Sequence, residues 1–447
     1  MSPNEQELCK KEIGQLLAQK LIEPCKSPWA CPAFYVNKHS DQKRGKKRLV
    51  INYKELNEAL FPIWYPLPNK DLLLAKIANA NVFSKFDLKS GFWQIGIIPA
   101  DRYKTAFTVP HGQYQWTVMP FGLKNAPSEF QKRMEDIFGG VEYVIVYIDD
   151  LLIFSRDVNS HKQHLEQFYQ LVYKHGLVLS DSEEKFQIGK IRIDYLGLHI
   201  EKGCVELQPH VLTHLLKFPD IIADVKTLQR FLGCLNYIRN FYEKQSEDTK
   251  VLLNRLKKKA TSWTNEMTAA VISIKSKLND LPKLKLADTN LPFILETDAS
   301  DHTWAAVLLQ KHGRKELVCA YSSGSFDDTE KKYPSSHKEI LAVKRGIKRF
   351  HLFLKSVRFI VRTDLKHMKQ MLANKRLLEQ GRTRVLRWAL WLEGFDFDIV
   401  YKSGAENYLA DMLTREGSQE VKEMKMFRPL QQHEASTSSS QSSQSKS

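Results

Sequence analysis

Two adjacent aspartates, Asp149 and Asp150, interrupt the otherwise apolar stretch VEYVIVYIDDLLIF (141–154). The β-branched and aromatic residues on both sides predict two buried strands, and the two polar residues between them predict a hairpin turn. The pair is compatible with an ordinary tight turn. It is also compatible with half of a divalent-metal site, because two carboxylates this close repel each other unless a cation lies between them. The metal hypothesis requires further acids.

One further acid lies upstream. Asp87 ends the predicted strand of VFSKFDLKSGFWQIGII (82–98), just before a Ser90-Gly91 break. It is either a turn or helix-cap residue or the third carboxylate that Asp149 and Asp150 require.

A second group of acids occurs near the C-terminus. Asp298 and Asp364 each follow an apolar strand, Glu339 lies in the first turn of a long predicted helix, and Asp411 lies on the last one. Glu339 also fits a capping box with Ser336, and Asp364 fits a helix N-cap. Four acids from strand ends and helix starts of one small domain favour a two-metal site for phosphodiester cleavage.

Composition limits the classes of protein. The chain has 447 residues, enough for about two to four domains. Lys and Arg number 67 against 51 Asp and Glu, a net charge of +16, which favours a polyanionic partner, nucleic acid before a membrane surface. A merely soluble basic protein remains the alternative. Six cysteines without CxxC pairs predict neither a disulfide framework nor a zinc site, and therefore a reducing compartment. No signal peptide or long apolar run occurs, so we expect a soluble intracellular protein.

Periodicity predicts the elements that position these acids. Apolar residues at helical spacing predict helices in four regions: 4–23, 121–137, 160–175 and 209–280. Alternation predicts a hairpin over 190–207, turning at Lys202-Gly203. The cations of QKRGKKR (42–48), between two predicted strands, either face solvent or close over a triphosphate. Segment 281–292 is predicted to be a linker. Three strands followed by alternating helices and strands then predict a mixed-sheet α/β domain of about 125 residues.

These motifs resemble a known family. Residues 24–200, with FDLKSGF, PFGLKNAP and YIDD in order, resemble a retroelement reverse transcriptase. Residues 290–415, with TDAS, HKEILAV, VRTD and NYLADMLTR, resemble its ribonuclease H. KFPDIIADVKTLQRFLGCLNYI (217–238) resembles the thumb and connecting region of plant pararetroviruses, the caulimovirus family, with Ty3/gypsy retrotransposons next.

The resemblance implies an α+β right-hand polymerase (fingers, palm, thumb) followed by an α/β ribonuclease H-like domain with a mixed five-stranded sheet. The implied fingers and palm comprise residues 1–205, and the thumb and helical connection comprise 206–290. The ribonuclease H domain comprises 291–416, and a disordered Ser/Gln-rich tail comprises 417–447.

The resemblance also implies the catalytic, metal-binding residues. They are the palm and nuclease acids: Asp87, Asp149, Asp150, Asp298, Glu339, Asp364 and Asp411. Each site would take two Mg²⁺ ions, with Mn²⁺ as a substitute. In the palm, Asp87 and Asp149 would bind both ions, with Asp150 nearby.

Other roles concern the nucleotide and the primer. Lys38 and Arg48 would hold the incoming phosphates, and the backbone of Leu88 would meet the triphosphate. Phe92 would act as a steric gate against the 2′-hydroxyl, unless it only packs in the core, and Phe121 would line the nucleotide pocket. The implied primer grip is Tyr195, Leu196 and Gly197.

Two departures from the family pattern stand out. Phe121 occupies a position where some retroviral enzymes have glutamine. Tyr401 stands three residues before Gly404, where many ribonucleases H have a histidine that assists product release, so slow cleavage is expected. No D-[ST]-G triplet, zinc knuckle or His/Cys integrase signature occurs, which indicates the polymerase product of a longer polyprotein.

The implied function is RNA-directed and DNA-directed DNA synthesis with degradation of the RNA strand of RNA–DNA hybrids. The expected partners are an RNA template, a DNA primer/template, RNA–DNA hybrid, dNTPs and a tRNA primer. No membrane partner is expected, and the chain is expected to be a monomer. The expected location is host-cell cytoplasm and virus-like particles. The alternatives are a non-catalytic nucleic-acid-binding remnant and a polymerase whose nuclease is silent.

Overall fold

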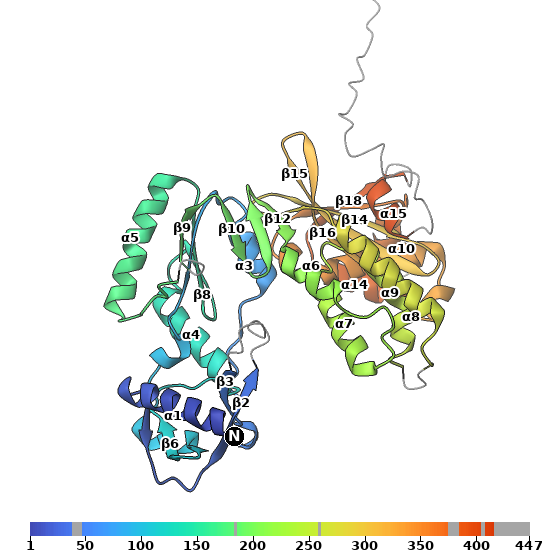
Figure 1. The fold of residues 1–447 in the computed structure, drawn as a ribbon. Helices are drawn as coiled ribbons and strands as arrows, with labels where there is room; N and C mark the ends of the chain where they lie inside the picture. Colours follow the sequence, from blue (N-terminus) through green and yellow to red (C-terminus); the bar gives the residue numbers. More distant parts are fainter. Residues whose placement is uncertain (38–46, 183–185, 258–260, 374–383, 404–406, 415–447) are drawn as a thin grey trace, which may run out of the picture.

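The computed structural model describes residues 1–37, 47–182, 186–257, 261–373, 384–403 and 407–414 (Figure 1). Lys38, most of the basic 42–48 segment and the predicted tail 417–447 therefore lie outside the described residues.

The predicted fingers form one five-stranded sheet at the N-terminal end of the molecule (Figure 1). Its order is β1-β6-β5-β2-β3, with bounds Ile22–Pro24, Gly112–Trp116, Phe107–Val109, Cys31–Asn37 and Lys47–Ile51. Helix α1 (Pro3–Ala18) begins with a capping box between Ser2 and Glu5 and buries Cys9, Ile13 and Leu16. Helix α2 (Lys54–Ala59) follows β3.

The predicted palm is built on a four-stranded sheet that carries the first group of acids. Its order is β7-β8-β4-β9, with bounds Val144–Tyr147, Asp150–Ser155, Val82–Asp87 and Gln187–Lys190. Helices α4 (Ala126–Phe138) and α5 (Val158–Lys174) pack against it, and Phe168 of α5 stacks on Phe86 with ring centroids 5.0 Å apart. His161, on α5, is buried between Ser84 and Ser155, whose hydroxyls lie 2.7 and 2.8 Å from its ring nitrogens.

A third sheet joins the palm to the rest of the chain. Its order is β10-β11-β12-β13, with bounds Arg192–Tyr195, Leu198–Glu201, Cys204–Leu207 and Leu284–Lys285. The predicted turn at Lys202-Gly203 is present, with φ angles of 50° and 67°. Strand β13 lies inside the segment predicted to be a linker, so that prediction is wrong there. Pairing of Leu284 with Val205 creates this strand, and a two-residue strand has too short an alternation to be recognised from sequence.

Helices of the predicted thumb and connection lie beside the C-terminal domain, where α8 contacts β16 (Figure 1). They are α6 (Pro209–Leu216), α7 (Val225–Tyr237), α8 (Gln245–Asn254) and α9 (Asn265–Lys277). Asp224 caps α7 and Thr264 caps α9 through side-chain acceptors. One continuous core includes Phe83 of the palm, Phe231 of α7 and Val307 of the C-terminal domain, so the three regions pack as one body.

The C-terminal domain contains the predicted mixed five-stranded sheet. Its order is β16-β15-β14-β17-β18, with bounds Lys315–Ser325, Thr303–His312, Phe293–Ala299, Phe359–Thr363 and Phe397–Tyr401. The pairs β14–β15 and β15–β16 are antiparallel, whereas β14–β17 and β17–β18 are parallel. The helices within the described part of this domain are α10 (Ser335–Arg349), α11 (His351–Leu354), α12 (Met368–Ala373), α14 (Arg384–Leu392) and α15 (Tyr408–Thr414).

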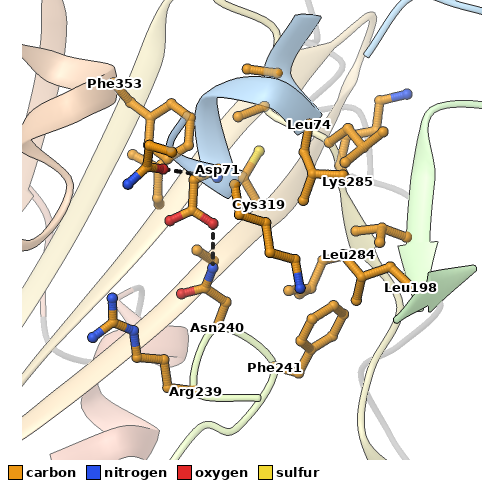
Figure 2. A pocket seen from close by; sticks show the side chains of 18 of the residues that line it. Asp71, Leu74, Leu198, Arg239, Asn240, Phe241, Leu284, Lys285, Cys319 and Phe353 are labelled. Carbon is orange, nitrogen blue, oxygen red and sulfur yellow. Dashed lines mark hydrogen bonds between the residues drawn. The ribbon is translucent and has the colours of Figure 1, made fainter. Parts of the chain in front are cut away.

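A cavity of about 440 Å³ lies at the joint of palm, thumb and C-terminal domain (Figure 2). Asn240 lines this cavity and connects the three regions. Its side-chain amide donates to Asp71 of α3 (Lys70–Lys76) at 3.3 Å, and its backbone carbonyl accepts from the Tyr321 N–H at 3.0 Å. Arg349 of α10 donates to its side-chain oxygen. Among the described residues, no helix combines the length and the apolar composition that crossing a bilayer requires.

Candidate active sites

A strained turn presents the palm acids. The sequence predicted Asp149-Asp150 as the turn, but the turn is Ile148-Asp149 and Asp150 is the first residue of β8. Ile148 has φ 53°, which is costly for a β-branched residue. Its N–H donates to the fully buried Gln131 of α4 at 2.7 Å, and the Gln131 amide donates to the Val146 carbonyl at 3.2 Å. Helix α4 therefore holds the turn in place.

Strand pairing brings the upstream acid to this turn. Asp87 and Asp150 are direct partners across antiparallel strands β4 and β8. Lys85, two residues before Asp87, places its ammonium 3.1 Å from Asp150 Oδ1. The backbone of Asp87 is held as well, because its backbone carbonyl accepts from the Ser180 N–H at 2.7 Å. The predicted palm acids thus share one end of one sheet.

Gly91 makes room for the carboxylate of Asp149. A Cβ on Gly91 would lie 2.9 Å from Asp149 Oδ1 and 3.0 Å from the ring of Phe130. A neighbour would have to move, and Phe130 is fully buried. We expect Gly91→Ala to displace Asp149 and to lower DNA synthesis at least about tenfold while hybrid cleavage persists. Steady-state rates of both reactions check this, with Gly96→Ala as control because its Cβ position is open.

The predicted nucleotide pocket adjoins these acids. The Arg48 guanidinium lies 5.1 Å from the ring centroid of Phe121, and Phe121 lies 5.2 Å from Phe92. These side chains come from β3, from the loop before α4 and from the 3₁₀ turn Gly91–Gln94. Leu88 is buried and forms an isolated antiparallel β-bridge with Leu179, so the predicted contact of its backbone with a nucleotide stays a prediction. Of this predicted set, Lys38 alone lies outside the described residues.

Phe92 packs in the core and also borders Phe121 of the predicted nucleotide pocket, so its gate role stays a prediction. The ring is 9% exposed and packs on Phe130 with centroids 5.2 Å apart, and its other neighbour is the pocket residue Phe121. We expect Phe92→Ala to weaken discrimination against ribonucleotides by about 10- to 200-fold, the range for a pocket that excludes by shape. Competing rNTP and dNTP incorporation measures this. Unchanged sugar discrimination in protein that still cleaves hybrid would show that Phe92 only packs.

The predicted primer grip includes a tight turn that hydrogen bonds from Tyr237 and Lys70 support. Leu196 and Gly197 form the turn between β10 and β11, with φ angles of 48° and 71°. The Tyr237 hydroxyl, at the end of α7, donates to the Leu196 carbonyl, and Lys70 donates to that hydroxyl at 2.7 Å. Tyr195 is fully buried, and burial, with smaller contributions from Asp150 and Tyr147, raises the pKa of its phenol. The Lys85 ammonium lies between this residue and Asp150, at 6.0 Å from the Tyr195 ring centroid and 3.1 Å from Asp150 Oδ1.

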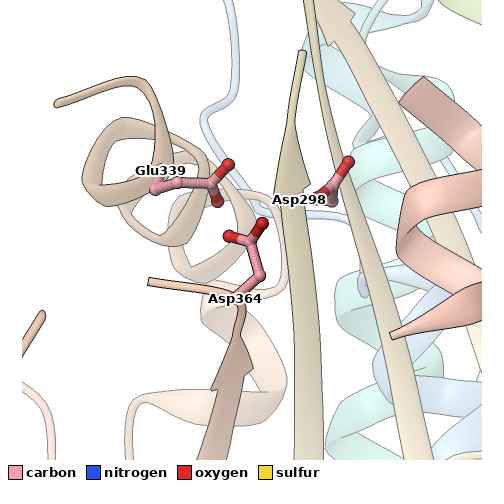
Figure 3. Close-up of side chains that lie close together, drawn as sticks. All are labelled: Asp298, Glu339 and Asp364. Carbon is pink, nitrogen blue, oxygen red and sulfur yellow. The ribbon is translucent and has the colours of Figure 1, made fainter. Parts of the chain in front are cut away.

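Three of the four predicted nuclease acids converge. Asp298 on β14, Glu339 on α10 and Asp364 after β17 place carboxylate oxygens within 4.8 Å of one another (Figure 3). Burial raises the pKa of Glu339 to about 9, with further contributions from Asp364 and Asp298. A buried acid that resists ionisation in this way is stabilised in its charged form by a cation. Oxygen ligands suit Mg²⁺ or Mn²⁺. These residues therefore fit a divalent metal.

The capping interpretations of these acids are wrong. Helix α10 begins at Ser335 with Pro334 as its N-cap, and the Glu339 carboxylate accepts instead from the Ala299 N–H at 3.1 Å. Helix α12 begins at Met368, four residues after Asp364, so Asp364 is not its N-cap. Both acids are therefore available to the site.

For the fourth predicted nuclease acid, the structure describes the helix that carries it but not its side chain. Asp411 belongs to α15, and its side chain lies outside the described residues. Two neighbours dock the helix on β14: Asn407 donates to the Thr297 carbonyl at 3.0 Å, and Thr414 donates to Asp298. Tyr401, at the end of β18, is exposed.

Three supporting residues were missed by the sequence analysis: Gln131, Lys85 and Tyr237. Strand alternation places Lys85 on the same face as Asp87, which was an available signal. Gln131 and Tyr237 contact the backbone of distant segments, and no local pattern reveals that.

The comparisons with known proteins agree with this geometry. Residues 36–200 match the family of reverse transcriptases (RNA-dependent DNA polymerases), and residues 288–395 match the RNase H-like domain found in reverse transcriptase. Together these matches cover more than half of the chain. The fold is also similar to that of the foamy viral protease-reverse transcriptase solved with RNA/DNA hybrid, at TM-score 0.75 and 23% identity, over 96% of this chain and 57% of that one. The predicted right-hand polymerase with a ribonuclease H-like domain is therefore confirmed.

Two viral polyproteins are close in sequence. The chain is 42% identical over 452 aligned residues to the genome polyprotein of Petunia vein clearing virus (isolate Hohn), matching along its whole length and spanning 20% of that polyprotein. It is 42% identical over 421 residues, 93% of the chain, to the enzymatic polyprotein of Cauliflower mosaic virus (strain Strasbourg), of which it spans 62%. The chain belongs to the reverse transcriptase–ribonuclease H family of the plant pararetroviruses.

Proposed function

We propose that this chain copies an RNA template into DNA, hydrolyses the RNA strand of the resulting hybrid and completes the second DNA strand. The observation that carries the proposal is the presence of two separate acidic centres on one chain. Asp87, Asp149 and Asp150 lie at one end of the palm sheet, and the carboxylate oxygens of Asp298, Glu339 and Asp364 lie within 4.8 Å of one another in the nuclease domain.

In the palm, Asp87 and Asp149 would hold two Mg²⁺ ions, or Mn²⁺ in their place. When bound, such cations would lower the pKa of the primer 3′-hydroxyl and neutralise charge on the departing pyrophosphate. Arg48, whose guanidinium lies 5.1 Å from the ring centroid of Phe121, would bind the phosphates bidentately. Phe92 limits the space at C2′ of the sugar, and the turn at Leu196-Gly197 supports the primer end.

In the nuclease domain, Asp298, Glu339 and Asp364 would hold the cations, together with Asp411 on α15. Because burial and the neighbouring Asp364 and Asp298 raise the pKa of Glu339, a cation bound here would favour release of a proton from this group. The rigid positions of Asp298 on β14 and Glu339 on α10 orient the scissile phosphate relative to the attacking water.

The proposed partners follow from charge and from the relatives. The foamy viral enzyme was solved with RNA/DNA hybrid, and a net charge of +16 suits such a polyanion. We propose an RNA template, DNA primer/template, dNTPs and a tRNA primer as substrates, and action as a monomer in host cytoplasm and virus-like particles. The proposed divisions remain 1–205, 206–290, 291–416 and 417–447.

The test is extension of a labelled DNA primer on a differently labelled RNA template, with dNTPs and with Mg²⁺, Mn²⁺ or EDTA. The expected result is extension together with shortening of the RNA, both lost in EDTA. Extension without loss of RNA would assign a silent nuclease, consistent with Tyr401. Binding of the hybrid without either reaction would overturn the proposal in favour of a non-catalytic binding protein.

A further inference from the structure

We propose that Lys85 is a positioning residue of the palm site. It would hold Asp150 as the partner of a protein cation and so leave metal binding to Asp87 and Asp149. This inference rests on the proposed polymerase function and concerns how the three palm acids divide their roles.

The first observation is the position of Lys85 within the sheet. Residues 85 and 87 of β4 project to the same face, because side chains alternate along a strand. Asp87 pairs with Asp150, and Lys85 pairs with Leu152, on the neighbouring strand β8. Lys85 therefore lies diagonally across from Asp150, within reach of a long side chain. The ammonium is 3.1 Å from Asp150 Oδ1.

The second observation is the enclosure of the pair. The side chains of Lys85 and Asp150 are 22% and 33% exposed. The same ammonium donates to the Asp194 carbonyl at 3.4 Å and lies 6.0 Å from the ring centroid of Tyr195. Lys85 thus connects the catalytic strands to β10, which ends in the primer grip. A lysine fixed at three points has a defined position, unlike a solvated surface cation.

The third observation is a contrast between the two acidic centres. Among the described residues, the nuclease trio is the one group of three acids whose ligand oxygens all lie within 4.8 Å of one another. The palm trio does not meet this condition, although Asp87 and Asp150 are direct strand partners. Pairing with Lys85 accounts for the difference, because it draws the Asp150 carboxylate toward the ammonium.

The net charge of the palm site depends on Lys85 and Asp150. The three palm acids and Lys85 together carry a charge of about −2 when ionised. Lys85→Met makes it about −3 and frees Asp150 to turn toward bound cations, whereas Asp150→Asn makes it about −1 and leaves an unpaired ammonium beside them. The double variant returns to about −2. Cation affinity should therefore increase in the first variant, decrease in the second and return near the starting value in the third.

The experiment measures Mn²⁺ binding to the full chain, by the electron paramagnetic resonance signal of free Mn²⁺, independently of activity. All variants carry Asp364→Asn, which weakens binding at the nuclease site. We expect Lys85→Met to bind Mn²⁺ about tenfold more tightly and Asp150→Asn about tenfold more weakly. Lys85→Arg, which keeps the charge, should stay near the parent. Lys89→Met is the matched control, because it removes a lysine two residues beyond Asp87 that pairs with Asp181 at 3.3 Å.

Folding and function are checked separately. The Lys85 variants with Asp364 restored should cleave hybrid at the rate of the unsubstituted chain, and if Lys85→Met fails this check, Lys85→Gln replaces it. Unchanged Mn²⁺ affinity in the folded Lys85 variant, or shifts of the same sign for Lys85→Met and Asp150→Asn, would overturn the proposal. Absence of primer extension in the parent would remove the proposed function, yet the order of Mn²⁺ affinities would still report on Lys85.

Discussion

Asp149→Asn is expected to abolish DNA synthesis while cleavage of RNA–DNA hybrid continues at the parent rate. The carboxylate lies in the Ile148-Asp149 turn, against Gly91, and the amide that replaces it carries no charge for a divalent cation. Loss of a ligand from a two-metal site lowers kcat by at least about a thousandfold. The nuclease acids come from β14, α10 and the end of β17, and this substitution does not touch them.

Primer extension and hybrid cleavage in the same preparation measure this effect. Asp101→Asn is the matched control: it makes the same chemical change at a partly exposed fingers residue that pairs with Lys104 at 2.6 Å. Extension by the Asp149 variant at the rate of this control would exclude Asp149 from the metal site.

Asp364→Asn is expected to produce the reverse result, with hydrolysis of hybrid lost by about a thousandfold or more and DNA synthesis retained. Asp364 is one of the three converging nuclease acids, and its charge is one cause of the raised pKa of Glu339. The variant therefore loses a metal ligand and also relieves like-charge repulsion. We expect the pKa of Glu339 to be lower in the variant, and the metal-free protein to unfold at an equal or higher temperature.

The measurement combines hybrid cleavage, primer extension and thermal unfolding in EDTA. Asp328→Asn is the control, since Asp328 is 97% exposed and its ion pair with Lys331 contributes little to stability. If either Asp149→Asn or Asp364→Asn removed both activities from folded protein, the assignment of two independent sites would be wrong.

The sequence alone indicated the strands that end near Asp87, Asp298 and Asp364, and the acids themselves, but not the short strands Ile22–Pro24, Phe107–Val109 and Gly112–Trp116 of the fingers sheet. Buried strands have a strong local signal, because apolar residues alternate or run continuously and polar residues stop them. Asp87, Asp298 and Asp364 were recognisable for this reason, and so was the mixed sheet that follows residue 290. The motifs FDLKSGF and YIDD carried the resemblance that the comparisons later confirmed.

Tertiary structure decided how those acids are held and which capping and linker predictions were wrong. Strand β13 exists only because Leu284 meets Val205, and the turn falls on Ile148 only because Gln131 accepts its N–H. The Glu339 carboxylate accepts from the Ala299 N–H and does not cap its helix. Lys85 forms an ion pair with Asp150 on the neighbouring strand. Each of these contacts joins residues that are distant in the chain or on different strands. Local periodicity carries no information about such partners, since their positions depend on how the whole chain packs.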